Sequence, residues 1–114
     1  MKNFLFVLRK PSYDGLYIQE MIDIILTTAA FEQNVNVLLL DDAVFHLKRN
    51  QTAHKNTATL FELLETMDVT EIFVETESLE TRGLNSQMLT QKVQMKTRAT
   101  MGEFMSQFDI VFAG

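Results

Sequence analysis

Residues 70–84, TEIFVETESLETRGL, carry the clearest local signal for the fold of this chain. This stretch opens with the apolar run Ile72-Phe73-Val74 and changes character at Glu75, where polar and acidic residues begin. A buried strand that ends in polar groups and continues into a helical turn is typical of open α/β sheets, which place their ligands at the carboxyl ends of strands. The stretch therefore predicts a strand over residues 71–74 and a candidate site at Glu75. The alternative is that Glu75 is an exposed loop acid with no task.

Further strands are predicted on both sides of this stretch. Residues 4–8 and 35–40 are continuous apolar runs without alternation, which suits strands that are covered on both faces, as in a parallel sheet. Residues 92–98 alternate and predict a short edge strand, and residues 110–112 predict a last strand.

Helical spacing of apolar residues predicts the elements between the strands. The predicted helices cover residues 16–31, capped by Asp14, a short turn over 43–47, a helix after the Thr59–Glu62 capping box, and a helix opened by a Thr100–Glu103 capping box. Residues 85–88 are predicted to form a loop. Strands that alternate with helices predict one α/β domain over residues 1–114, a three-layer α/β/α sandwich with a mostly parallel five-stranded sheet.

Two of the predicted helices carry apolar residues whose use the sequence leaves open. In the helix over residues 16–31, Ile24 and Leu26 widen the apolar face beyond one stripe, so the helix is either deeply packed or shares a face with a partner subunit. Met101, Phe104 and Met105 fill a core or, because thioether chains adapt well to partners, form an interface.

Composition excludes several classes of function. The 114 residues carry a net charge of −5 and no cysteine. The acidic balance argues against direct nucleic-acid binding, and the basic pair Lys48-Arg49 is interpreted as solvated surface. Without cysteine the chain has no disulfides, no thiolate metal site and no persulfide chemistry of its own. No segment approaches the ~20 apolar residues of a membrane span, so we expect a cytoplasmic protein that binds no membrane.

Cofactor and metal sites find little support in the sequence. Neither a GxGxxG nor a Walker pattern is present, so no cofactor is predicted. Asp41 and Asp42 follow the strand over residues 35–40 and could bind a hard cation, although one of them capping the next turn is the simpler interpretation. His46 is interpreted as a structural histidine, and His54 as part of an exposed loop.

Several segments together resemble the DsrE/DsrF-like sulfur-relay family, and within it the TusC (DsrF-type) subunits. The segment QEMIDIILTTAA is similar to the family's Glu-x-x-Asp-x-x-Leu-x-Thr-x-Ala helix, and DAVFHL to the pattern Asp-Gly-Val-Phe-Gln-Leu. The closing FDIV matches an aromatic-Asp-Val-Ile ending. The segments lie at residues 19–30, 42–47, 61–64, 68, 78–84 and 108–111.

The resemblance implies a relay that passes persulfide sulfur toward 2-thiolation of the wobble uridine of certain tRNAs. It also implies TusB-like and TusD-like partner subunits in a heterohexamer. In the family the sulfur rides on a cysteine just after the third strand of the TusD-like subunit, and this position corresponds to Glu75. A carboxylate cannot accept a persulfide, so the leading hypothesis is a non-catalytic subunit that supports the carrier by contact.

Two other hypotheses come from different classes. An enzyme in its own right would use Asp41, Asp42 and Glu75 around a cation, where mutual repulsion of the carboxylates would raise one pKa. No Lys, His or Ser pattern completes a known reaction for such a site. A homo-oligomeric ligand-binding or regulatory module without sulfur chemistry is the third hypothesis.

Overall fold

The protein is built on a five-stranded sheet in which every strand pair is parallel. The computed structural model describes residues 2–10, 15–47, 69, 71–89 and 92–114. The strand order is β4-β3-β2-β1-β5. The strands are β1 (Asn3–Leu8), β2 (Asn34–Leu39), β3 (Ile72–Glu75), β4 (Gln94–Lys96) and β5 (Ile110–Ala113). The five predicted strands and their parallel sheet are confirmed.

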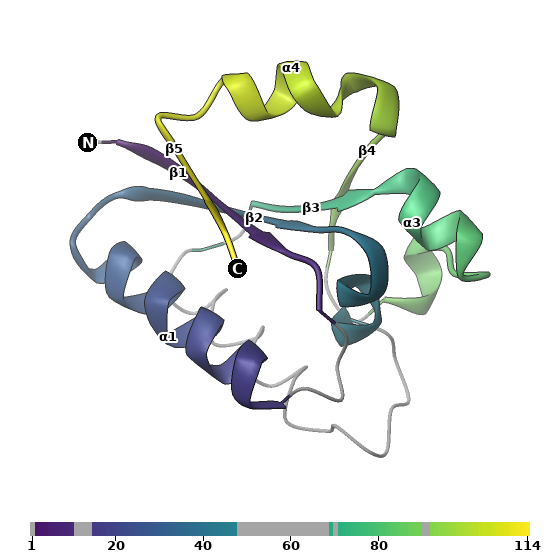
Figure 1. Cartoon of the computed structure of the whole chain (residues 1–114), viewed down its shortest axis with the longest axis horizontal. Coiled ribbons are helices and arrows are strands. Elements are labelled where there is room, and N and C mark those ends of the chain that lie inside the picture. The colour runs from purple at the N-terminus through teal and green to yellow at the C-terminus, as the bar shows by residue number, and fades with distance from the viewer. Residues whose placement is uncertain (1, 11–14, 48–68, 70, 90–91) are drawn as a thin grey trace.

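Helices cover the two faces of this sheet (Figure 1). The long helix α1 (Gly15–Ala30) lies on one face, and the short helix α4 (Met101–Ser106) lies on the other. The predicted α/β/α sandwich is therefore confirmed. Short helical segments complete the described chain: α3 (Thr76–Thr81) and the 3₁₀ helices η1 (Asp41–Leu47), η2 (Ser86–Met88) and η3 (Arg98–Thr100). None of the helices in these ranges is long and apolar enough to span a bilayer.

The apolar runs of the central strands divide their side chains between two cores, one on each face. On the α1 face, Phe6 and Leu8 of β1 pack with Ile18, Ile22 and Ile25 of α1. On the α4 face the core consists of Leu5, Val7, Leu38, Leu40, Phe73, Met101 and Phe104. Because successive residues of a strand point to opposite faces, a strand covered on both sides needs no polar alternation.

The prediction for the start of α4 is wrong in detail. Thr100 makes no capping bond to the helix; its hydroxyl donates instead to the carbonyl oxygen of Thr97 at 2.9 Å. The reason is that η3 begins two residues earlier and leads directly into α4, so Thr100 already has helical backbone angles. Residues 86–88, predicted as loop, form a 3₁₀ turn. The helix expected after the Thr59–Glu62 box and the Asp14 cap lie outside the described residues.

The apolar residues of α4 serve the core in this chain. Met101 and Phe104 are 8% and 6% exposed, so little of either side chain remains for a partner to contact. Met105 is half-buried against the same core. A role of these three residues in an interface stays a prediction.

Candidate functional site

Glu75 is the last residue of β3, and the structure places its side chain inside the molecule. The residue is 5% exposed, and its backbone is still extended before α3 begins at Thr76. The alternative of an exposed loop acid is therefore wrong. Acidic residues are rarely this buried unless they are paired, so the partners of Glu75 decide what this position does.

Two side chains hold the carboxylate of Glu75. The Ser78 hydroxyl donates to Oε1 at 2.6 Å from one turn into α3. The Arg98 guanidinium donates through Nη2 to Oε1 at 2.9 Å and through Nε to Oε2 at 3.3 Å. A two-pronged arginine–carboxylate contact fixes direction as well as charge, and such charge-assisted bonds are stronger than neutral ones.

Strand pairing explains how Arg98 reaches Glu75. β4 runs parallel to β3 with Lys96 opposite Glu75, and the chain then turns into η3, which begins at Arg98. Glu77 fixes the turn by accepting the Arg98 backbone N–H at 2.9 Å. The Arg98 side chain is 63% exposed, whereas that of Glu75 is 7% exposed, so the pair joins the interior to the surface.

The contact sets the protonation state of Glu75. The hydrogen bond from Arg98 lowers the pKa of this carboxyl below its ordinary value; burial opposes that shift, and the Ser78 bond and the nearby Arg98 and Arg82 charges reinforce it. Glu75 in turn raises the pKa of Arg98. The predicted raised pKa from crowded carboxylates is therefore wrong for Glu75, because a guanidinium, not another acid, is its main neighbour.

Asp41 and Asp42 lie at the neighbouring end of β2 and are both exposed. The backbone N–H of Asp41, a residue with φ of 52°, donates to the Ser78 hydroxyl at 2.9 Å. Asp42 forms an ion pair with Arg82 Nε at 2.9 Å, and Arg82 also donates to the Ser78 carbonyl oxygen. Ser78, which is fully buried, thus connects the ends of β2 and β3.

Arg82 owes its position to the way α3 ends. Gly83 has φ of 69°, a left-handed conformation that glycine adopts without strain, and its N–H donates to the Glu80 carbonyl oxygen. The N–H of Leu84 reaches back to the Leu79 carbonyl oxygen, which completes a Schellman ending. Arg82 is therefore held in the last turn, beside Ser78 and Asp42.

The arrangement gives no support to a cation site at these strand ends. Within the described ranges, no group of three or more His, Asp or Glu side chains is placed to hold a metal ion. His46 is fully buried, and its Nε2–H donates to the Lys10 carbonyl oxygen at 2.9 Å, as expected for a structural histidine. His54 and the Lys48-Arg49 pair lie outside the described residues.

Sequence reasoning identified Glu75 but missed Ser78 and Arg98. Ser78 stands three residues after Glu75, within one helical turn, and this spacing was a usable signal. Arg98 is 23 residues away, and only the pairing of β4 with β3 brings it close. The sequence left the strand order open, so it could not select Arg98.

We expect Glu75 to make stability depend on pH. Its pKa is lower in the folded chain than in the unfolded chain, so its contribution is present above the unfolded value and is lost as pH falls through the folded one. The difference in unfolding free energy between wild type and Glu75→Gln should therefore shrink from about pH 7 to about pH 3, measured by urea denaturation. Glu80→Gln, on the exposed side of α3, is the control. An unchanged difference at both pH values would contradict the prediction.

Comparison with known proteins places this chain in a family. The family model described as the DsrE/DsrF-like family matches residues 2–113. The intracellular sulfur oxidation protein DsrF of Allochromatium vinosum is 32% identical, over 99% of this chain and 96% of its own. The TusC homolog of Pseudomonas aeruginosa is 28% identical, over 96% of each chain.

A solved structure agrees with the fold. The crystal structure of the ychN protein from E. coli superimposes over 100% of both chains with a TM-score of 0.85. At 18% identity this likeness shows the fold alone. The predicted resemblance is confirmed by the family match and by relatives named DsrF and TusC homolog. The chain belongs to the DsrE/DsrF-like family.

Proposed function

We propose that this chain is the non-carrier, TusC-like subunit of a TusBCD-type sulfur-relay complex in the cytoplasm. In this role it supports persulfide transfer for 2-thiolation of the tRNA wobble uridine. The observation that carries the proposal is the state of Glu75: at the position that the resemblance matches to the carrier cysteine, this chain has a buried carboxylate paired with Arg98.

The chemistry of Glu75 supports a role by contact. Carrying sulfane sulfur requires a thiolate that forms a sulfur–sulfur bond, and the chain contains no cysteine. The Glu75–Arg98 pair instead ties β3 to the start of η3 and leaves a largely exposed guanidinium at the end of β3. A charged surface of this kind can orient a partner whose own cysteine carries the sulfur. In the proposal the partners are a TusD-like carrier and a TusB-like subunit, with two copies of each chain.

The proposal is tested by co-expression of this chain with TusB-like and TusD-like chains from its own genome. Native mass spectrometry should give a hexamer with two copies of each. After treatment with a sulfur donor, the intact mass of the TusD-like chain should rise by one sulfur atom, and the mass of this chain should not change. Sulfur bound to this chain, or no mixed complex at all, would refute the proposal.

The DsrF match favours a second candidate, a subunit that serves sulfur oxidation instead of tRNA thiolation. The named relative with 32% identity is described as an intracellular sulfur oxidation protein. Removing the gene for this chain separates the two candidates. Loss of 2-thiouridine from tRNA, restored by the wild-type gene, supports thiolation. Unchanged tRNA with impaired oxidation of stored sulfur supports the second candidate.

A further inference from the structure

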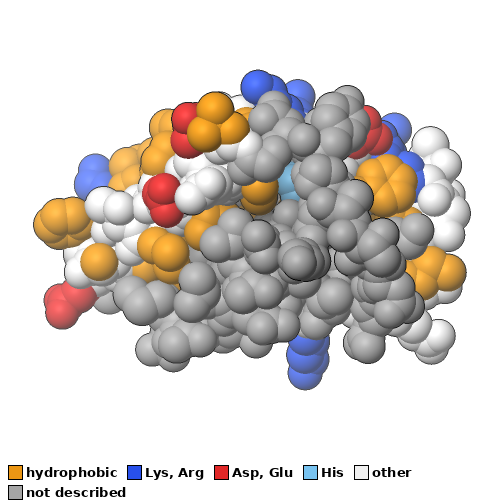
Figure 2. Space-filling model, turned by 90° about the horizontal axis from the view of Figure 1, so that it is seen from below, with side chains coloured by type: hydrophobic (Ala, Val, Ile, Leu, Met, Phe, Trp, Pro, Cys, Tyr) orange, Lys and Arg blue, Asp and Glu red, His pale blue; other side chains and the backbone are white. Residues whose placement is uncertain are grey.

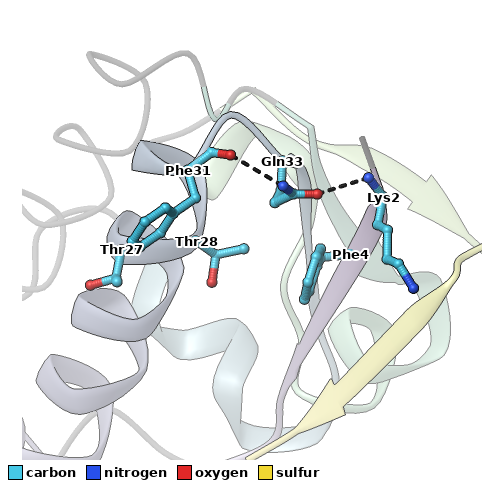
Figure 3. Close-up of a pocket in the computed structure, with 6 residues that line it drawn as sticks. All are labelled: Lys2, Phe4, Thr27, Thr28, Phe31 and Gln33. Carbon is cyan, nitrogen blue, oxygen red and sulfur yellow. Dashed lines mark hydrogen bonds between the residues drawn. The ribbon is translucent and has the colours of Figure 1, made fainter.

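The α1 side of the molecule carries two adjoining hollows that the proposed site at Glu75 does not use. The larger, about 550 Å³, is lined by Lys2, Phe4, Thr27, Thr28, Phe31 and Gln33 (Figure 3). The smaller, about 250 Å³, is lined by Asp23, Ile24, Thr27 and Thr28. Because Thr27 and Thr28 belong to both, the hollows form one groove along the C-terminal half of α1. We call this surface the α1 groove.

Large apolar side chains stand exposed along the α1 groove. Phe31 is 72% exposed and Ile24 is 39% exposed. Figure 2, which views the molecule from the α1 side, shows hydrophobic side chains interspersed with acidic ones over this region. Exposed aromatic and aliphatic groups gathered around a hollow are typical of a protein contact surface.

The edge strand β5 extends this apolar surface. Ile110 and Phe112 are 37% and 41% exposed. They pair in register with Phe4 and Phe6, so they point to the α1 face of the sheet. Phe112 contacts Phe6 with ring centroids 5.7 Å apart, and Phe6 stacks on Phe4 at 6.0 Å.

The walls of the groove are tied together. The Gln33 side chain accepts the backbone N–H of Lys2 at 2.8 Å and donates to the Phe31 carbonyl oxygen at 3.1 Å (Figure 3). These bonds connect the start of β1 to the residue that follows α1. A surface held in this way loses little conformational freedom when a partner binds.

Opposite charges stand on the two sides of the groove. Asp23 lies one helical turn before Thr27, and Lys2 lies on the opposite wall beside Phe4. Neither forms a salt bridge with another described residue. Glu20, which lies two turns before Thr27, is farther out along α1.

We propose that the α1 groove binds the α1 groove of a second copy of this chain about a two-fold axis near Thr27 and Thr28. Phe31 of each copy enters the hollow beside Phe4 of the other, and Asp23 of each meets Lys2 of the other. The α1 groove suits such pairing because it has both the exposed ring of Phe31 and a hollow, and both a negative and a positive side chain. A two-fold interface needs this self-complementarity, since each residue is used twice.

This pairing rests on the proposed function, because it describes how two copies of this chain contact each other within the proposed hexamer. A hexamer with two copies of each of three chains contains one pair of this chain, and the α1 groove provides a contact between its members. The site at Glu75 is at the carboxyl edge of the sheet, on a different part of the surface, and stays available to the carrier subunit.

Charge reversal tests the pairing in the full-length chain, alone and in the co-expressed complex. Lys2→Glu and Asp23→Lys should each weaken dimerisation, by about 3- to 30-fold in Kd measured by sedimentation velocity. The double variant Lys2→Glu, Asp23→Lys should regain most of the affinity, because both ion pairs re-form with reversed sign. Phe31→Ser should weaken it on the order of 100-fold, since the ring is used twice. Glu103→Lys on α4 is the control and should change nothing.

Cross-linking gives a second readout that does not depend on electrostatics. Because the chain has no cysteine, Thr27→Cys introduces its only thiol, close to the proposed axis. A short bis-maleimide should join two copies of this variant rapidly, whereas exposed Gln107→Cys should not react in this way at the same concentration.

The outcomes separate this inference from the proposed function. If a mixed complex forms, but the double variant does not regain dimerisation affinity and Thr27→Cys does not cross-link, only the pairing of the α1 grooves is overturned. The groove would then be assigned to contact with a different chain. A chain that stays monomeric at all concentrations and in all mixtures would overturn the pairing as well. A self-dimer with recovery by the double variant, but without any mixed complex, would support the inference and refute the proposed function.

Discussion

Ile25→Ala is expected to lower the free energy of unfolding by about 2–5 kcal/mol. Ile25 is fully buried between α1 and the sheet, in the core that includes Phe6, Leu8 and Val37. Truncation removes three carbon atoms from water-excluded contacts and leaves a cavity that the central strands are too constrained to fill. Urea denaturation followed by far-UV circular dichroism measures the change.

The neighbouring residue provides a matched control. Ile24 is the same residue type in the same helix, but it is 39% exposed and lines the α1 groove. Ile24→Ala changes helix propensity as Ile25→Ala does, so the difference between the two variants isolates burial. We expect Ile24→Ala to change stability by no more than about 1 kcal/mol and to weaken dimerisation instead. Equal losses of stability would show that α1 does not pack on the sheet as described.

The fold was predictable because the hydrophobic pattern of the strands indicates which of their faces are buried. Residues 4–8 and 35–40 show no polar alternation, and the structure explains this by cores on both faces of the sheet. Of the two alternatives for the widened apolar face of α1, deep packing does not hold at Ile24, which is 39% exposed, whereas the adjacent Ile25 is fully buried. Local patterns of this kind depend on neighbours within one turn or one strand.

The candidate site was predictable only in part, because its partners come from distant segments. Glu75 could be located from the end of an apolar run. Its burial could not, because it depends on Arg98, which β4 brings alongside β3. The same limit applies to β5. An apolar strand has the same sequence pattern at the centre and at the edge of a sheet, and Phe112 is exposed because the strand order places β5 at the edge.

The ion pair at the end of β3 leads to the other large expected effect. Glu75→Lys should lower the free energy of unfolding by about 3–5 kcal/mol, because it places an unpaired charge at a buried position. The new ammonium would occupy a site that is 7% exposed, beside a guanidinium that now repels it. The Ser78 hydroxyl would also lose its acceptor while fully buried. Urea denaturation measures this change in the free energy of unfolding. If Glu75→Lys is too unstable for that measurement, thermal melting of the milder Glu75→Gln variant tests the same contact.

Two further variants decide whether this loss comes from the pair itself. Glu80→Lys makes the same change at an exposed position of α3 and should stay within about 0.5 kcal/mol of wild type. Adding Arg98→Glu to Glu75→Lys should recover part of the lost stability, because a pair of reversed sign can form across the β3–β4 register. If the double variant is less stable than Glu75→Lys alone, the two side chains do not act as a pair. Recovery would instead show that Glu75 and Arg98 form an ion pair on which the stability of the end of β3 depends.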